Sequence, residues 1–152
     1  MSTTLASPDL TQSPPRSARC RLGGYVLLPR LLDKCRAELA GKNGEYHYNC
    51  PMDRHFFNFT GVDHEALKTE AATGKGDGEL LEWINANAKT QRGAWEVLQW
   101  SDYHLNRGPD SDSETVAFFH GLINNHTKTR EDITTWADAL DLDDYCSFGG
   151  KA

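Results

Sequence analysis

Residues 22–53 constrain the fold more than any other stretch of the chain, because they require a helix bounded by turns. After the glycine pair at 23–24, apolar residues recur at three-to-four spacing over residues 27–39, which predicts one buried face of an α-helix. Pro29 then falls in the first helical turn, where its missing N–H costs no hydrogen bond. Gly41 is the expected left-handed residue that ends the helix.

The other face of this helix is charged, with side chains three or four residues apart at Arg30, Asp33, Lys34 and Arg36. Asp33 can reach Arg30 one turn earlier and Arg36 on the next turn, which suggests a solvated ladder of ion pairs, each worth about 0.3–0.5 kcal/mol. The alternative is a basic patch that holds a carboxylate or a phosphate. The ladder is the preferred interpretation, because charge runs on amphipathic helices usually face water.

A second helix is expected to begin with Cys50 at or near its N-cap, Pro51 at its first position and Asp53 in its first turn. The exposed amides and the helix dipole would favour the thiolate form of a cysteine placed there. Cys50 is therefore the candidate nucleophile of the chain, with His47 or His55 as the group that orients it. A buried cysteine that acts as a small apolar side chain is the preferred alternative.

The four cysteines, at positions 20, 35, 50 and 146, include no CxxC pair. In a reducing compartment this pattern indicates free thiols rather than disulfides. A loose ligand-like spacing joins His47, Cys50, Asp53 and His55, but it does not match the paired motifs of structural zinc sites. The sequence therefore predicts no metal and no cofactor.

The predicted fold is all-α, because helical patterns run along the chain and no tract of β-branched residues is long enough for a central strand. We expect residues 20–152 to form one compact domain, a bundle of about six or seven short helices. Residues 1–19 are rich in Ser, Thr and Pro and poor in large apolar side chains, which predicts a flexible N-terminal arm.

Several helix boundaries are predicted by local signals. Gly61 should break the helix that follows Cys50, and Asp63 should cap the next one. Two later pairs have the spacing of a capping box: Ser111 with Glu114, and Thr129 with Asp132. The glycine-rich segment 74–78 lacks the residue order of a phosphate-binding loop, so we predict a flexible turn there.

Charge and hydropathy narrow the function further. Residues 1–60 carry eight Lys and Arg against five Asp and Glu, whereas residues 61–152 carry eight against seventeen. The acidic later part argues against nucleic acid as a partner, because such binding depends on neutralising phosphates. The chain has neither a signal-peptide pattern nor a long apolar run, so we expect a soluble, cytoplasmic protein without a membrane partner.

The C-terminal segment has larger side chains than a free tail needs. The helical pattern ends after Leu142, yet Tyr145 and Phe148 are large enough to dock. We expect these aromatic residues and the acidic pair at 143–144 to pack against the basic helix at residues 30–36. The ligand site should then lie between these two segments.

Four segments are distinctive in combination: GGYVLLPRLLDKCRAELAGKNGEYHYNCPMD, WEVLQWSDY, REDITTWADALDLDDY and SFGGKA. In these segments the chain resembles a bacterial family known as a domain of unknown function, number five-zero-six-nine in that series. The resemblance covers nearly all of residues 22–152. It implies a small soluble bacterial protein, and it supplies no reaction, cofactor or catalytic residue.

Three classes of function remain open. The preferred class is the binding of a small anionic ligand, because binding needs fewer converging groups than catalysis. Its candidate residues are Arg30, Asp33, Lys34, Arg36, Tyr46, Tyr48, Trp95 and Trp100. The second class is a protein–protein interaction module built on the N-terminal arm and exposed aromatic residues. The third is an enzyme that uses a Cys50 thiolate, which is disfavoured because no complete catalytic motif is present.

Overall fold

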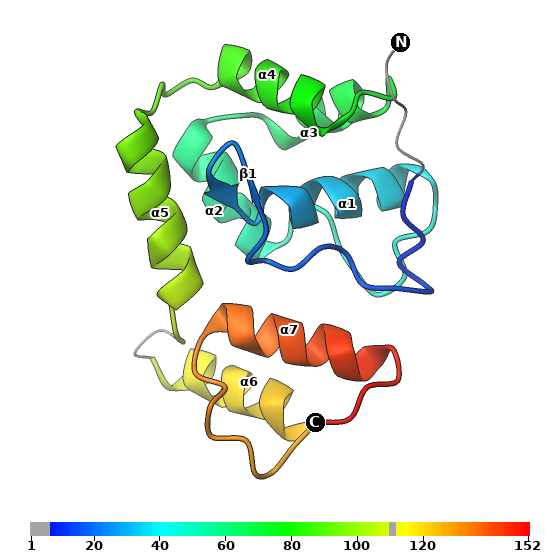
Figure 1. The fold of residues 1–152 in the computed structure, drawn as a ribbon, viewed down its shortest axis with the longest axis vertical. Helices are drawn as coiled ribbons and strands as arrows, with labels where there is room; N and C mark the ends of the chain where they lie inside the picture. The colour runs from blue at the N-terminus through cyan, green and yellow to red at the C-terminus, as the bar shows by residue number, and fades with distance from the viewer. Residues whose placement is uncertain (1–6, 110–111) are drawn as a thin grey trace.

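The computed structural model describes residues 7–109 and 112–152, and helices carry the fold of this part of the chain (Figure 1). Seven helices are described: α1 Leu28–Leu39, α2 Pro51–Thr60, α3 His64–Ala71, α4 Asp77–Asn87, α5 Ala94–Asn106, α6 Ser113–Asn124 and α7 Trp136–Ser147. Their number and the all-α architecture agree with the prediction.

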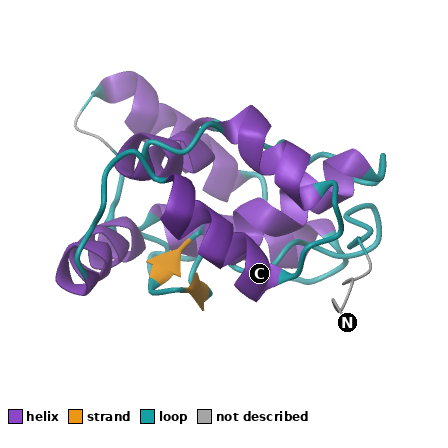
Figure 2. Ribbon diagram, turned by 90° about the horizontal axis from the view of Figure 1, so that it is seen from above, coloured by secondary structure: helices purple, strands orange, loops and turns teal. Residues whose placement is uncertain are grey.

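A short hairpin precedes α1 and lies at one side of the helical body (Figure 2). Its antiparallel strands are β1 Arg21–Leu22 and β2 Tyr25–Val26, paired in the register Arg21 to Val26 and Leu22 to Tyr25. The turn between them needs glycine, because Gly23 and Gly24 both have positive φ, at 60° and 84°. The glycine pair in the sequence indicated this turn, but strands of two residues are too short to produce a recognisable sequence pattern.

Helix α1 lies at the centre of the molecule, with α3 and α4 on one side and α7 on the other (Figure 1). Its predicted apolar face forms the middle of the largest core, where Leu28, Leu31, Leu32 and Cys35 are fully buried. Pro29 stands in the first turn and Gly41 has φ 68° just after the helix, as predicted. Leu39 was expected on the buried stripe but is exposed, because it is the last residue of α1.

Aromatic side chains from α2, α5 and the hairpin complete this core. Phe56 is fully buried and meets the ring of Tyr25 edge-on, with 5.2 Å between the ring centroids. Trp100 of α5 stacks on Phe59 at 5.3 Å. Such pairs add about 0.5–1.5 kcal/mol beyond the area that they bury, and they attach α5 firmly to the central layer.

Helices α6 and α7 pack against each other below α1 in Figure 1 and form a second, smaller core. Its buried members are Phe119, Ile123, Ala139 and Leu142. The opposite side of α7 reaches the central layer through Leu140, which packs with Val26 and Leu27. One side of α7 therefore closes the small core, and the other faces α1.

The expected flexible arm is wrong for residues 7–19, which pack against the domain. Leu10 is only 1% exposed and Ala18 is equally buried. Arg16 bonds to Asp33 of α1 at 3.0 Å and to Asp77 of α4 at 2.8 Å. A segment rich in Ser and Pro is held here by a few buried anchors, and its composition does not reveal them. The rest of the predicted arm, residues 1–6, lies outside the described residues.

Some of the predicted helix boundaries are correct and others are not. Gly61 ends α2 with φ 72°, and the side chain of Asp63 accepts a hydrogen bond from the backbone of Glu65 at the start of α3. The predicted flexible turn at 74–78 is wrong in its second half, because Gly76 caps α4 and Asp77 opens it.

The two predicted capping boxes are replaced by neighbouring residues. Ser111 lies outside the described residues, and Asp112 caps α6 by accepting a hydrogen bond from Thr115 at 2.9 Å. The box at Thr129 is wrong: α7 begins later, with Thr135 at its N-cap and Asp138 as the returning carboxylate. A Thr-to-Asp spacing recurs in this polar segment, so the pattern alone could not choose between the two starts.

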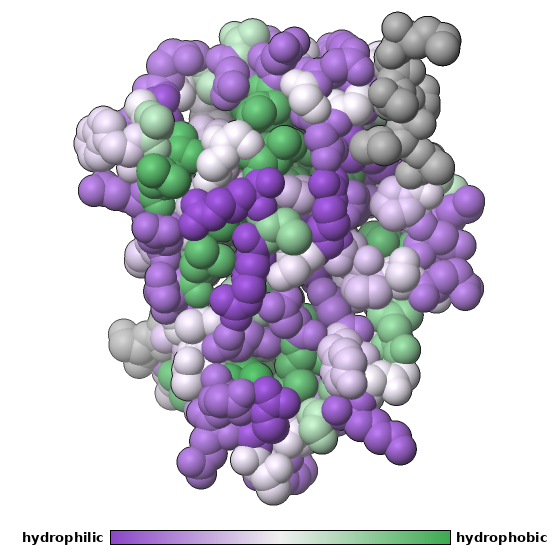
Figure 3. Space-filling model, in the orientation of Figure 1, coloured by the Kyte–Doolittle hydropathy of each residue, from purple (hydrophilic) through white to green (hydrophobic). Residues whose placement is uncertain are grey.

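Within the described ranges, no helix is both long enough and apolar enough to cross a membrane. The face of the molecule in Figure 3 is mostly hydrophilic, with hydrophobic patches between the polar side chains. Large apolar side chains that remain exposed include Trp95, Leu98, Tyr103, Phe118 and Tyr145.

Candidate functional site

The charged side chains of α1 point into the protein rather than into water. Arg30, Asp33, Lys34 and Arg36 are only 5%, 9%, 4% and 6% exposed. The predicted solvated ladder is therefore wrong. Segments distant in sequence cover this side of the helix and supply its partners. Residues 16 and 77 bind Asp33 and Arg36. Residues 46, 50, 53 and 144 surround Arg30 and Lys34.

Arg30 is bound by Asp144 of α7 in a forked geometry. Arg30 Nη1 and Nη2 donate to the two oxygens of Asp144 at 2.7 and 3.1 Å, and Tyr46 Oη donates to the same carboxylate at 2.8 Å. Burial opposes the charge on Arg30, but the bonds to Asp144 outweigh it and raise the pKa of the guanidinium. The prediction that the acidic C-terminal region docks on this helix is confirmed for Asp144.

Tyr46 stays a neutral donor in this arrangement. Burial and the hydrogen bond to Asp144 both raise the pKa of its phenol. Its ring also lies under the Arg30 guanidinium, 5.5 Å from the ring centroid. Tyr145, which the sequence placed beside this helix, is instead 60% exposed.

Lys34 is held at the start of α2. Its Nζ donates to Asp53 at 2.9 Å and to Cys50 Sγ at 3.2 Å. The same Asp53 carboxylate accepts a hydrogen bond from the backbone of Asn49 at 3.0 Å. Asn49 has φ 59°, a left-handed conformation that an L-residue adopts at a cost.

The predicted start of the second helix is correct. Cys50 is the N-cap of α2, Pro51 follows it, and Asp53 stands in the first turn. The Cys50 side chain makes no capping hydrogen bond. The amides of the first turn of α2 therefore have no side-chain acceptor from the N-cap position.

Asp33 and Arg36 belong to a separate network on the far part of α1. Arg16 bridges Asp33 and Asp77, and Arg36 Nη1 donates to Asp77 at 2.7 Å. Burial would raise the pKa of Asp77, but its hydrogen bonds to Arg16 and Arg36 outweigh burial and lower it. The sequence analysis missed Arg16 and Asp77. The sequence does hold a signal for Asp77, which is an aspartate in the glycine-rich segment 74–78 just before an apolar helical stripe.

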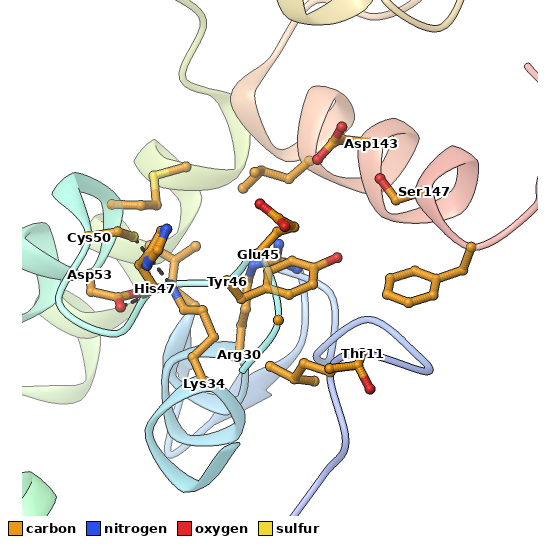
Figure 4. Close-up of a pocket in the computed structure, with 16 residues that line it drawn as sticks. Thr11, Arg30, Lys34, Glu45, Tyr46, His47, Cys50, Asp53, Asp143 and Ser147 are labelled. Carbon is orange, nitrogen blue, oxygen red and sulfur yellow. Dashed lines mark hydrogen bonds and ion pairs between the residues drawn. The ribbon is translucent and has the colours of Figure 1, made fainter. Parts of the chain in front are cut away.

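A cavity of about 510 Å³ lies between α1, the segment 44–47, the start of α2 and α7 (Figure 4). Its walls contain Arg30 and Lys34 from α1, together with Tyr46, His47, Cys50 and Asp53. The apolar part of its lining is formed by Leu10, Leu27, Met52, Leu140 and Phe148. The cavity thus lies between the basic helix and the C-terminal helix, and it has the size of a typical small-molecule site.

Three other predicted binding residues lie elsewhere. Tyr48 is buried in the main core and its hydroxyl donates to the backbone oxygen of His64 at 2.7 Å. Trp100 packs against that core. Trp95 is 64% exposed on α5. Among the predicted residues, the cavity brings together Arg30, Lys34 and Tyr46, with Cys50 and His47 beside them.

The lining of the cavity is negative overall, because its carboxylates outnumber its cations. Asp144 neutralises Arg30, and Asp53 neutralises Lys34. Glu45 and Asp143 add negative charge to the lining, and Asp143 lies 2.7 Å from His126 Nε2. A ligand in this cavity would therefore meet donors that are already partly used, next to two further carboxylates.

The cationic group in contact with Cys50 is Lys34, at 3.2 Å. His47 lines the same cavity as Cys50. His55 contacts other groups: its Nε2 lies 3.2 Å from Arg107 Nη1, and its ring packs 4.9 Å from that of His104. Over residues 7–109 and 112–152, no group of three or more His, Cys, Asp and Glu side chains is placed to hold a metal ion.

Comparison with proteins of known families complements this geometry. No curated protein matches the chain. One family matches, over residues 12–146, which include most of the packed N-terminal segment, all of α1 to α6 and most of α7. The chain therefore belongs to the family described as Domain of unknown function (DUF5069).

Proposed function

We propose that this protein binds a small anionic ligand in the cavity between α1 and α7. The observation that carries the proposal is the position of Lys34, whose buried ammonium lines a cavity of about 510 Å³ at the start of α2. A buried cation beside a cavity is an expensive arrangement for stability alone, because both members of an ion pair lose their hydration.

The surroundings of Lys34 support the proposal. Its Nζ lies 2.9 Å from both carboxylate oxygens of Asp53 and 3.2 Å from Cys50 Sγ, so an acceptor on a ligand would share the three N–H donors with these groups. The first turn of α2, which has no side-chain cap, adds a dipole that favours an anion at this end of the cavity. The backbone of Asn49, which is left-handed, donates a hydrogen bond to the Asp53 carboxylate and so fixes the partner of Lys34.

A thermal-shift screen against small anionic metabolites tests the proposal. A ligand at one hundred times its dissociation constant should stabilise the protein by about 2.7 kcal/mol. Ser147→Trp should abolish this stabilisation, because Ser147 is an exposed residue on the cavity wall. The matched control is Ser113→Trp, another exposed serine, which lies at the start of α6 outside the cavity. Equal responses of both variants to every ligand would contradict binding in this cavity.

A second candidate function is a reaction at Cys50. It is supported by the contact of Cys50 Sγ with the Lys34 ammonium at the N-cap of α2, on the wall of the same cavity. A thiol in such surroundings can act as a nucleophile. Iodoacetamide at neutral pH should then alkylate Cys50 faster than the exposed Cys20. Slower alkylation of Cys50 than of Cys20 would remove this candidate.

A third candidate is a protein–protein interaction module. It is supported by the exposure of Trp95, Leu98 and Tyr103 along α5. The N-terminal segment no longer contributes to this candidate over residues 7–19, because they are packed on the domain. Sedimentation velocity of the wild type and of Trp95→Ser would show whether this surface drives self-association. If the wild type and the variant are both monomeric, self-association through this surface is excluded, and its partner would have to be a different protein.

A further inference from the structure

We infer that Cys50 and Lys34 become joined by a covalent sulfur–nitrogen bond when a hydroperoxide enters the α1–α7 cavity. This bond is a modification of the protein itself, and it does not depend on the proposed function. Three features support it: the contact between the two side chains, the access that the cavity gives, and the proline that follows Cys50.

The sulfur and the nitrogen are already in contact. Lys34 Nζ lies 3.2 Å from Cys50 Sγ and 2.9 Å from both carboxylate oxygens of Asp53. Lys34 is only 4% exposed on α1. Cys50 is held between the left-handed Asn49 and Pro51 at the start of α2. Because the fold holds both groups, a reaction between them requires little further loss of conformational freedom.

A hydroperoxide can reach the sulfur through the cavity. Cys50 is partly exposed and lines the cavity of about 510 Å³ together with Lys34, and Figure 4 shows the two residues at one side of it. A neighbouring cation and the N-terminal end of a helix stabilise negative charge on sulfur, which is the form that hydroperoxides oxidise. Cys35, which follows Lys34 in sequence, is instead fully buried in the main core.

The first step converts the Cys50 thiol to a sulfenic acid. The sulfur attacks one peroxide oxygen, so that an S–O bond forms and the O–O bond breaks. Sulfur loses two electrons, and the hydroperoxide gains them and leaves with the thiol proton as an alcohol, or as water if it is hydrogen peroxide.

A sulfenic acid condenses with a nearby thiol to a disulfide or with a nearby nitrogen to a sulfenamide. The backbone nitrogen that follows Cys50 cannot take this part, because Pro51 has no N–H. The nitrogen in contact with the sulfur is Lys34 Nζ.

The second step joins the two side chains. Lys34 gives one proton to the Asp53 carboxylate, and its nitrogen attacks the sulfur, so that an S–N bond forms and the S–O bond breaks. The hydroxide leaves as water with a second proton of the ammonium group. The products are a sulfenamide between Cys50 Sγ and Lys34 Nζ, one water and a neutral Asp53. The lysine charge and the carboxylate charge disappear together, so no unpaired charge remains buried at Asp53.

Mass spectrometry of the full chain treated with hydrogen peroxide detects this bond. The product should be about 2 Da lighter than the reduced protein, and dithiothreitol should restore the original mass. Trypsin should no longer cleave after Lys34, because its amine is consumed, and the peptide 31–36 should stay joined to the peptide 43–54. Cys35 lies in the first of these peptides and should still react with iodoacetamide after unfolding.

Lys34→Arg tests the part played by the amine. Arginine keeps a positive charge beside Asp53 but cannot lose a proton to attack the sulfur. The sulfenic acid should then persist, so dimedone should label Cys50 about tenfold more than in the wild type. Cys50→Ser should give no joined peptides, and Cys35→Ala should give them as the wild type does. Circular dichroism shows whether each variant folds, and the peptide map of the wild type decides the outcome if one does not.

Three results would overturn the inference. The first is a disulfide between Cys35 and Cys50, revealed by loss of the mass change in Cys35→Ala. The second is a Cys50 sulfinic acid, about 32 Da heavier than the thiol, without joined peptides. The third is oxidation of the exposed Cys20 while Cys50 stays reduced. None of these results affects the proposed function, which the metabolite screen with Ser147→Trp tests.

Discussion

Arg30 of α1 and Asp144 of α7 face each other through two hydrogen bonds, of 2.7 and 3.1 Å, with both side chains almost fully buried. This pair ties the C-terminal helix to the centre of the protein across 114 positions of sequence. It also forms one side of the cavity, because Arg30 and the neighbouring Asp143 both line it. Stability and the shape of the candidate site therefore depend on the same contact.

Removing one member of this pair should be costly. Asp144→Asn would leave the Arg30 charge buried beside a neutral amide, so we expect a loss of about 3–5 kcal/mol in the free energy of unfolding. The double variant Arg30→Met with Asp144→Leu should recover most of that loss, because no uncompensated charge remains. Urea denaturation followed by circular dichroism measures both. A single variant that loses less than about 1 kcal/mol would mean that α7 is held by its apolar contacts alone.

Stability should fall in mild acid because of His104. Burial, with additional repulsion from His55 and Arg107, lowers the pKa of His104 from 6.5 to about 4. Its Nδ1 is buried without a hydrogen-bond partner. Because the unfolded chain accepts a proton near pH 6.5 and the folded chain only near pH 4, stability present above pH 6.5 is lost as the pH falls toward 4.

The loss attributable to His104 should reach about 3 kcal/mol by pH 4. The measurement is the free energy of unfolding at a series of pH values between 7.5 and 4. His104→Phe should flatten this dependence, since the ring can still pack on Trp100, 4.4 Å away, and cannot be protonated. His120→Gln, at an exposed position of α6, is the control and should keep the wild-type slope.

Gly44 should not tolerate a side chain. It has φ 55°, and a Cβ at this position would lie 2.9 Å from the backbone oxygen of Leu10. Gly44→Ala should therefore destabilise the protein by about 1–3 kcal/mol and displace the segment that carries Leu10 from the cavity wall. Gly78→Ala is the matched control, since nothing lies near its Cβ in α4, and it should be neutral or stabilising by up to about 1 kcal/mol. Thermal denaturation of the two variants decides between these outcomes.

Arg16 should hold the N-terminal segment in place. Arg16→Leu would leave Asp33 and Asp77 without their shared partner, at a cost of about 1–3 kcal/mol. Limited proteolysis should then cleave within residues 7–19 before any other part of the chain. The control is Arg54→Leu, which removes an exposed arginine from α2. It should leave the cleavage pattern unchanged and alter the free energy of unfolding by no more than about 0.5 kcal/mol. Resistance of the Arg16 variant to cleavage would mean that Leu10 and Ala18 suffice as anchors.

The helices could be predicted because their signals are local. The apolar spacing of α1, the proline in its first turn and the Cys50-Pro51 start of α2 all depend on residues within a few positions of each other. The positions of the helix caps were harder to predict, because the same capping pattern can recur within a few residues. Thr129 and Thr135 are each followed three residues later by an aspartate, and it is Thr135 that caps α7, the helix that packs on α6.

The candidate site could be predicted only in part, because its partners come from distant segments. A row of charges on α1 has the same spacing whether it faces water or a buried carboxylate, so the pattern suggested a solvated ladder. The excess of acidic residues late in the chain did indicate a partner for Arg30, which is Asp144. Nothing local to α1 could indicate that Arg16 binds Asp33 or that Asp77 binds Arg36.

The burial of α1 on every side has a consequence for its dynamics. Ten consecutive residues, Leu28 to Ala37, are buried, so most of this helix has no solvent-exposed face. Its amide protons should exchange for deuterium only when the whole domain opens. The exchange rate of the α1 amides therefore reports the global stability of the domain. Faster exchange of the amides of α6 or α7 than of those of α1 would measure how readily these helices open and uncover the cavity.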